Sequence, residues 1–128
     1  MSNERPLLPA HRRTDVVTQQ EAAFHRDFVD EVIAAVEQND IVVVGMGQNP
    51  VVKNARKALD GAGLAYAYVG HGNYLTGYRR RLAVKMWSGY PTFPQVFVKG
   101  VLIGGCDELV AGLKDGSVKE RLAAPRVS

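Results

Sequence analysis

The sequence predicts one α/β domain built on a mixed four-stranded sheet with helices on both faces. At 128 residues the chain is long enough to bury a core without disulfide or metal staples. A strand, a helix and a second strand follow one another across residues 41–69, as in a right-handed parallel crossover. Two short apolar runs, 95–98 and 101–103, flank a two-residue turn, as in an antiparallel hairpin. The expected order is α-β-α-β-α-β-β-α.

The N-terminal part predicts a tail followed by one long helix. Residues 1–16 contain two prolines and several charges without apolar periodicity, so we expect a flexible tail. Thr18 and Glu21 have the spacing of a capping box, in which each side chain bonds a main-chain N–H of the first turn. Apolar residues then recur at helical spacing, which predicts a helix to about Gln38.

The central part predicts the crossover in detail. Residues 41–44 are all apolar, which is typical of a central strand covered on both faces. Asn49 is a good N-cap and Pro50 suits the first helical position, so the next helix should begin there. Glycines just after residue 60 mark its end, and residues 64–69 then form the second strand.

The C-terminal part adds further helices around the hairpin. One helix is predicted by four apolar residues at helical spacing: Leu75, Tyr78, Leu82 and Met86. Another is expected at about residues 107–113, after the hairpin. Ser117 and Glu120 repeat the capping-box spacing and predict a last helical turn or two. We therefore place the domain at residues 17–124, with a short tail at 125–128.

Composition narrows the classes of protein that remain. The single cysteine, Cys106, cannot form an internal disulfide, which fits a reducing compartment. The chain has no apolar run near the roughly 18 residues of a membrane span, and no signal-peptide pattern, so we expect a cytoplasmic protein. The net charge is +3, and the basic run at residues 79–81 fits a solvated helix face. A nucleic-acid surface would need a broader basic stripe with stacking aromatics.

Residues 87–109, WSGYPTFPQVFVKGVLIGGCDEL, resemble the glutaredoxin family, and its monothiol branch most of all. Both proline positions and the Gly-Gly-Cys-Asp segment stand in register, and the likeness extends over roughly residues 25–122. The resemblance implies the thioredoxin-like glutaredoxin fold, which has the element order predicted above.

The resemblance also implies a binding groove at the Thr92-Phe93-Pro94 segment. In glutaredoxins this proline is cis, so Pro94 should be cis as well. The main chain of Phe93 would then pair with the cysteinyl unit of glutathione. The same segment also fits a rigid turn before a strand, because cis X-Pro bonds are retained where a turn demands them. The two interpretations are compatible.

Charged residues of the implied groove have two interpretations each. Asp107 corresponds to the residue that receives the γ-glutamyl ammonium, with Gly105 and Cys106 beside it. Arg81 aligns with a helical arginine that neutralises the glycyl carboxylate in monothiol members. Asp107 would also suit a helix start without any ligand, and Arg81 would equally suit the surface.

The family's active motif, Cys-Pro-Tyr-Cys or Cys-Gly-Phe-Ser, falls on Asn49-Pro50-Val51-Val52. Asn49 replaces the first cysteine and Val52 the second, while Met46 or Gly47 replaces the usual upstream basic residue. A thiolate at a helix N-terminus has a lowered pKa and attacks a disulfide sulfur. A carboxamide cannot perform that step, so the reactive group has been lost.

We therefore expect a non-catalytic module that binds glutathione, a glutathionylated protein or an extended peptide, with no required cofactor. We expect no metal and no [2Fe–2S] cluster, because cluster iron requires thiolate ligands and position 49 has none. Nucleic acid and membrane are not expected partners.

Two alternatives remain open. One is a glutathione-dependent thiol–disulfide oxidoreductase of cell redox homeostasis that uses Cys106, whose place before a helix favours a thiolate. The same residue would also suit simple packing, since free cysteine behaves as a small apolar side chain. The other is a purely protein-interaction or regulatory module, because a fold does not determine a function.

Overall fold

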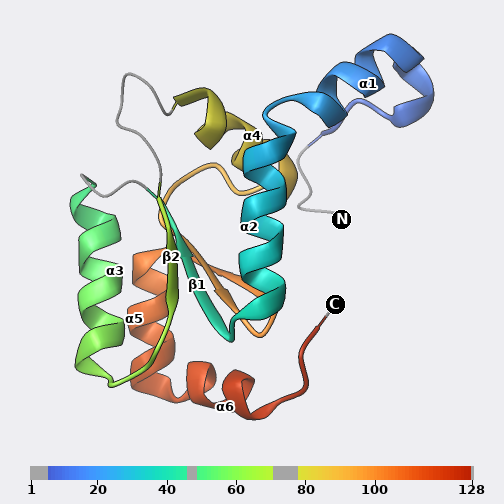
Figure 1. The fold of residues 1–128 in the computed structure, drawn as a ribbon. Helices are drawn as coiled ribbons and strands as arrows, with labels where there is room; N and C mark the ends of the chain where they lie inside the picture. Colours follow the sequence, from blue (N-terminus) through green and yellow to red (C-terminus); the bar gives the residue numbers. More distant parts are fainter. Residues whose placement is uncertain (1–5, 46–48, 71–77, 128) are drawn as a thin grey trace.

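The computed structural model describes residues 6–45, 49–70 and 78–127 (Figure 1). Its elements are η1 (Ala10–Arg12), α1 (Asp15–Ala23), α2 (Arg26–Gln38), β1 (Ile41–Val44), α3 (Pro50–Gly61), β2 (Ala67–Val69), α4 (Tyr78–Ser88), β3 (Gln95–Val98), β4 (Val101–Gly104), α5 (Cys106–Asp115) and α6 (Ser117–Ala123). From α2 to α5 this is the predicted order, and the α/β fold class is confirmed. In the described ranges no helix is both long and apolar enough to cross a membrane.

The sheet is mixed, with strand order β2-β1-β3-β4. β1 pairs in parallel with β2, and β3 pairs antiparallel with both β1 and β4. The crossover and the hairpin are therefore both confirmed. Lys99 and Gly100 have φ values of 51° and 85°. Two positive φ values in a two-residue hairpin loop match the twist of the flanking strands.

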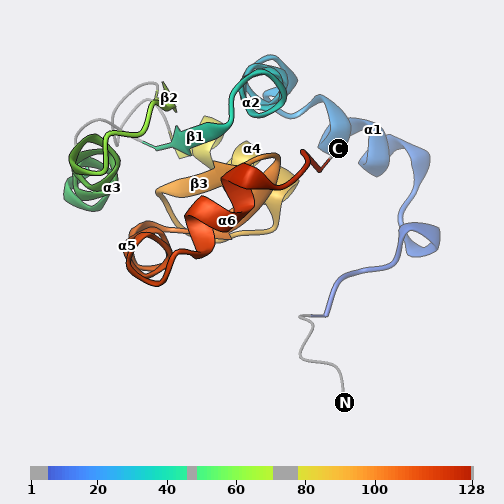
Figure 2. The same cartoon turned by 90° about the horizontal axis from the view of Figure 1, so that it is seen from below.

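Helices cover both faces of the sheet (Figure 1; Figure 2 shows the same layers from below). On one face α3, α5 and α6 contribute to a core cluster of Ile41, Val43, Val52, Ala55, Leu59, Val96, Val98, Cys106, Leu109 and Val118. On the other, α2 and α4 contribute to a cluster of Phe28, Val32, Val36, Val42, Val44, Val69, Val84 and Phe97. The residues of β1 alternate between the clusters, and all four are buried. Each such side chain stabilises the fold by about 1.5–3 kcal/mol.

The predicted long N-terminal helix is wrong, because the structure divides it into α1 and α2. His25 lies between them with φ 45°, a left-handed conformation that ends the first helix. Thr14 is the actual N-cap, since its side chain accepts a hydrogen bond from the Val17 N–H at 3.3 Å. Thr18 lies inside α1 and caps nothing. α1 also begins at Asp15, within the predicted N-terminal tail.

The division has a physical reason in the packing of the two helices. α2 buries Phe28, Val29, Val32 and Val36 against the sheet. α1 buries none of its residues and extends away from the sheet (Figure 1). The apolar residues therefore pack against the sheet only within α2, and α1 forms a separate helix outside the core.

Other element boundaries differ by a few residues. β2 begins at Ala67, three residues later than predicted, and Leu75 of the predicted fourth helix lies outside the described residues. The second capping box is also wrong: Gly116, with φ 85°, occupies the N-cap of α6. The N–H of Ser117 instead donates to Asp115 Oδ1 at 2.8 Å. A left-handed glycine therefore separates α5 from α6.

The last described residues run along the end of α2 and the β3–β4 turn. Arg126 donates to the carbonyl oxygens of Val36 at 2.7 Å and Asn39 at 2.9 Å. It also pairs with Asp40 at 3.0 Å. The N–H of the next residue bonds the carbonyl oxygen of Lys99 at 3.0 Å. The predicted C-terminal tail thus makes several tertiary hydrogen bonds.

Candidate functional site

Three segments that are far apart in the sequence meet at one end of the sheet. The Phe93–Pro94 peptide bond is cis, as predicted. The next residue, Gln95, pairs with Val44 at the end of β1, which leads toward α3. A Cβ placed on Gly105 would lie 3.3 Å from the Pro94 carbonyl oxygen, so the start of α5 also adjoins this turn. We call residues 92–94 and 105–107, with the start of α3, the candidate site.

The start of α3 holds the four residues on which the resemblance places the family's active motif. Asn49 is its N-cap, and Asn49 Oδ1 accepts a hydrogen bond from the Val51 N–H at 2.9 Å. Pro50 occupies the first helical position, as predicted. Val52 is fully buried, and a Cβ on Gly45 would lie 2.6 Å from Val52 Cγ2. The segment therefore caps the helix and packs onto the end of β1.

The turn before β3 is flanked by cationic side chains of α4. Lys85 Nζ lies 5.7 Å from the centre of the Phe93 ring, a distance suited to a cation–π contact. Arg81 lies four residues earlier, so it shares that face of α4. It is half-buried, and Thr92 is exposed. The positions expected to replace the upstream basic residue, Met46 and Gly47, lie outside the described residues.

The start of α5 is acidic. Asp107 and Glu108 stand in its first turn, where the helix dipole favours negative charge. Asp107 is exposed and adjoins the candidate site. Glu108 Oε1 accepts a hydrogen bond from the Tyr90 hydroxyl at 3.1 Å. The candidate site thus lies between an acidic helix start, α5, and a helix, α4, that carries only basic charges.

Comparison with known proteins was made by family, sequence and structure. No family model matches the chain. The chain is 38% identical over 118 residues to a glutaredoxin-like protein of Dictyostelium discoideum, covering 92% of this chain and 94% of that protein. This chain belongs to the glutaredoxin family. Arabidopsis thaliana monothiol glutaredoxin-S17 is 28% identical over an alignment of 113 residues that covers 84% of this chain and 22% of that longer protein.

Solved glutaredoxins share the fold of this family member. The crystal structure of a buckwheat glutaredoxin–glutathione complex matches it with a TM-score of 0.67 at 24% identity, covering 87% of this chain and 94% of the other. An oxidised glutaredoxin 2 from Chlamydomonas reinhardtii matches with a TM-score of 0.65 at 26% identity, covering 77% and 92%. The thioredoxin-like fold implied by residues 87–109 is therefore confirmed.

The single cysteine of this glutaredoxin is a core residue. Cys106 is 9% exposed and belongs to the cluster beneath α3 and α5. Burial raises the pKa of its thiol, and the carboxylates of Asp107 and Glu108 raise that pKa further. A helix N-terminus by itself lowers the pKa of a thiol, whereas burial and the two acidic neighbours raise that of Cys106. The thiol is therefore held protonated at neutral pH.

We expect Cys106 to react slowly with iodoacetamide. A raised pKa reduces the thiolate fraction at pH 7.5, and burial blocks access, so alkylation should be at least about tenfold slower than for free cysteine. The rate should increase as the pH rises past the ordinary thiol pKa. Mass spectrometry of timed samples measures the rate of alkylation. The same protein unfolded in concentrated urea is the control. Native alkylation as fast as in urea would contradict this account of the thiol.

Sequence reasoning missed three residues beside the candidate site of this glutaredoxin: Lys85, Tyr90 and Glu108. The spacing of Lys85, four residues after Arg81, was the available signal for the first. The other two meet across eighteen sequence positions, and no periodicity in the chain connects them. Of the predicted residues, the structure brings together Thr92, Phe93, Pro94, Gly105, Cys106 and Asp107, and it places Arg81 on the neighbouring face of α4.

Proposed function

We propose that this glutaredoxin-family protein binds glutathione, or a glutathionylated or other extended peptide, without catalysing thiol–disulfide exchange. One observation carries the proposal: Asn49, on which the resemblance places the family's first active-site cysteine, caps α3 with its carboxamide oxygen, which accepts a hydrogen bond from the Val51 N–H at 2.9 Å. The cis-proline turn and the acidic start of α5 are retained beside it. The buckwheat glutaredoxin crystallised with glutathione supports this ligand class for the family.

The main chain before β3 supplies the binding edge. The β1–β3 ladder ends at the pair of Val44 with Gln95, so the main chain of Phe93 lies beyond the last pair. Unpaired main-chain groups at a strand end can receive an extended peptide by strand addition. The ligand's ammonium would face Asp107 on α5, and its carboxylate would face Arg81 or Lys85 on α4.

The residues present do not fit an iron–sulfur cluster. Cluster iron is held by thiolates, and Asn49 offers a carboxamide that is already bonded to a main-chain N–H. Cys106 is buried, with a raised pKa. Among the described residues there is also no group of three or more His, Cys, Asp or Glu side chains placed to hold a metal ion. We therefore propose no cluster and no metal in the function of this protein.

Titration with S-methylglutathione, followed by amide chemical shifts, tests the proposal. This thioether cannot form a disulfide, so any binding is non-covalent. Millimolar ligand should shift the amides of Phe93, Cys106 and Asp107. The variant Asp107→Asn should bind at least about tenfold more weakly, because a charge-assisted hydrogen bond is lost. Unperturbed signals at all three amides of the wild type would reject the proposal.

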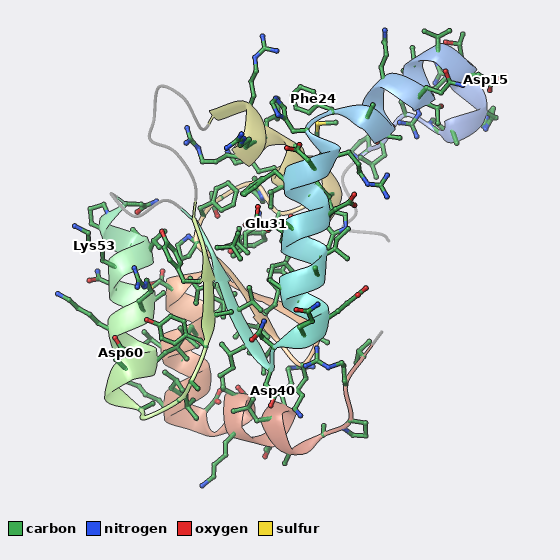
Figure 3. All side chains as sticks on the ribbon, viewed as in Figure 1. Asp15, Phe24, Glu31, Asp40, Lys53 and Asp60 are labelled. Atoms are coloured by element: carbon green, nitrogen blue, oxygen red, sulfur yellow. The ribbon has the colours of Figure 1, made fainter. Side chains whose placement is uncertain are left out.

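Asp60→Asn is the matched control. Lys53 lies near the start of α3, and Asp60 lies at the opposite end of that helix (Figure 3). The control should bind with wild-type affinity. A glutathione:disulfide exchange assay tests the non-catalytic part of the proposal. Exchange activity that Cys106→Ser abolishes would overturn that part and favour an oxidoreductase.

A further inference from the structure

We propose that Tyr90 and Glu108 form a latch that fixes the spacing between the cis-proline turn and the start of α5, and thereby the affinity of the candidate site. The latch consists of the hydrogen bond from the Tyr90 hydroxyl to Glu108 Oε1, at 3.1 Å. Its effect on ligand affinity rests on the proposed function, whereas its effect on the unliganded protein does not.

The main chain of Tyr90 is held from both sides. Its N–H donates to Ser88 Oγ at 3.2 Å, at the end of α4. Its carbonyl oxygen accepts from Gln95 Nε2 at 3.0 Å, at the start of β3. Gln95 is fully buried, so this second contact belongs to the core. Tyr90 is therefore a fixed point from which its ring reaches across to α5.

Two adjacent glycines make room for the latch. A Cβ on Gly104 would lie 2.7 Å from Glu108 Cγ and 2.8 Å from Glu108 Oε1. A Cβ on Gly105 would lie 3.5 Å from the Tyr90 hydroxyl and 3.3 Å from the Pro94 carbonyl oxygen. The Glu108 side chain thus lies over Gly104, and the Tyr90 hydroxyl lies over Gly105. The Gly-Gly pair permits the turn and α5 to approach closely.

The latch connects the two segments that a ligand would bridge. Tyr90 begins the turn that leads to Phe93, and Glu108 directly follows Asp107. A peptide paired with Phe93 and contacting Asp107 would depend on the spacing between them. Burial and the nearby Glu108 carboxylate raise the pKa of Tyr90, so the phenol remains a donor at neutral pH. The Tyr90 hydroxyl also contacts the Thr92 side chain and the Gly105 main chain, so it is a polar link between the turn and the start of α5.

Three substitutions separate positioning from charge. Tyr90→Phe and Glu108→Leu each remove the hydrogen bond, and each should weaken S-methylglutathione binding about fivefold. The double variant should bind no more weakly than Tyr90→Phe alone, because Tyr90→Phe has already broken the hydrogen bond to Glu108. Glu108→Gln keeps an acceptor oxygen while removing the charge, so it should bind within about twofold of wild type. Calorimetry gives the affinities, and thermal unfolding shows whether each variant is folded.

Tyr66→Phe is the control for loss of a tyrosine hydroxyl. Tyr66 accepts a hydrogen bond from Arg56 Nε at 3.3 Å, between the segment before β2 and α3. This control should leave the affinity unchanged. If Glu108→Gln binds as weakly as Glu108→Leu, charge rather than position decides affinity and the latch is refuted. If Tyr90→Phe does not fold, this Gln-against-Leu comparison still decides the question.

The failure of the latch and the failure of the proposed function give different results. If the wild type binds S-methylglutathione and Tyr90→Phe binds it with equal affinity, the latch is refuted but the proposed function is not. If the wild type does not bind, the amide shifts of the free variant decide. Changes at both Phe93 and Gly105 in Tyr90→Phe would support the latch, and unchanged shifts at both would refute it.

Discussion

Asn49→Cys should give this protein a glutathione:disulfide exchange rate at least about a hundredfold above that of the wild type. The N–H of Val51, which now bonds Asn49 Oδ1 at 2.9 Å, would face the new sulfur. This donor and the dipole of α3 would lower the pKa of the thiol below the ordinary value of about 8.5. The cis-proline turn and Asp107 are already in place beside it.

The matched control is Asn49→Ser. Serine caps a helix about as well as asparagine but carries no sulfur, so this variant should remain inactive. Asn49→Cys combined with Cys106→Ser should retain the new activity, since Cys106 is buried in the core. Iodoacetamide should alkylate the cysteine introduced at position 49 faster than Cys106. A folded, glutathione-binding Asn49→Cys variant without exchange activity would show that more than the sulfur is missing.

Local sequence signals were sufficient for most of the fold. The wholly apolar strand at residues 41–44 and the Asn49-Pro50 helix start are encoded by adjacent residues, and the structure places both as predicted. The hairpin was also predicted from local signals, because two apolar runs and the two-residue turn between them define it. The prediction of one long N-terminal helix was wrong, because the break at His25 depends on which residues pack against the core. α2 packs against the sheet and α1 does not.

The candidate site was predicted where a contiguous motif marks it. The glutaredoxin resemblance of one stretch of sequence, residues 87–109, implied the cis bond at Pro94 and the acidic residue at the start of α5, and the structure has both. The Tyr90–Glu108 hydrogen bond joins residues on different elements, so only the folded chain reveals it. The Gly-Gly pair before Cys106 was the one local sign that another group approaches the main chain there.

The contacts of Arg126 could not be predicted from the sequence either, because they join residues that are far apart in the chain. Its guanidinium donates to the Val36 carbonyl oxygen, ninety positions earlier in the chain. The last carbonyls of an α-helix have no partner within the helix, and a cationic donor there also complements the helix dipole. A side chain from the end of the chain thus caps the C-terminus of α2, the helix that covers one face of the sheet.

Arg126→Ala should lower the free energy of unfolding by about 2 kcal/mol, because two helix-end carbonyls lose a charged donor. The pair with Asp40 should contribute little, since the Asp40 side chain is 60% exposed (Figure 3 labels it at the end of α2). Urea unfolding measures the change as a lower midpoint at constant slope. Arg121→Ala, at an exposed position of α6, is the control and should change stability by less than about 0.5 kcal/mol.

A charge-preserving variant and a truncation separate the contributions of this segment. Arg126→Lys keeps the cation but cannot donate to two carbonyls from one planar group, so it should recover only part of the loss. Removal of residues 126–128 also deletes the hydrogen bond from the Val127 N–H to Lys99, so it should destabilise more than Arg126→Ala alone. Equal stability of wild type and Arg126→Ala would mean that water satisfies the α2 carbonyls as well as the guanidinium does. Residues 126 and 127 would then take up this position without contributing to the stability of the fold.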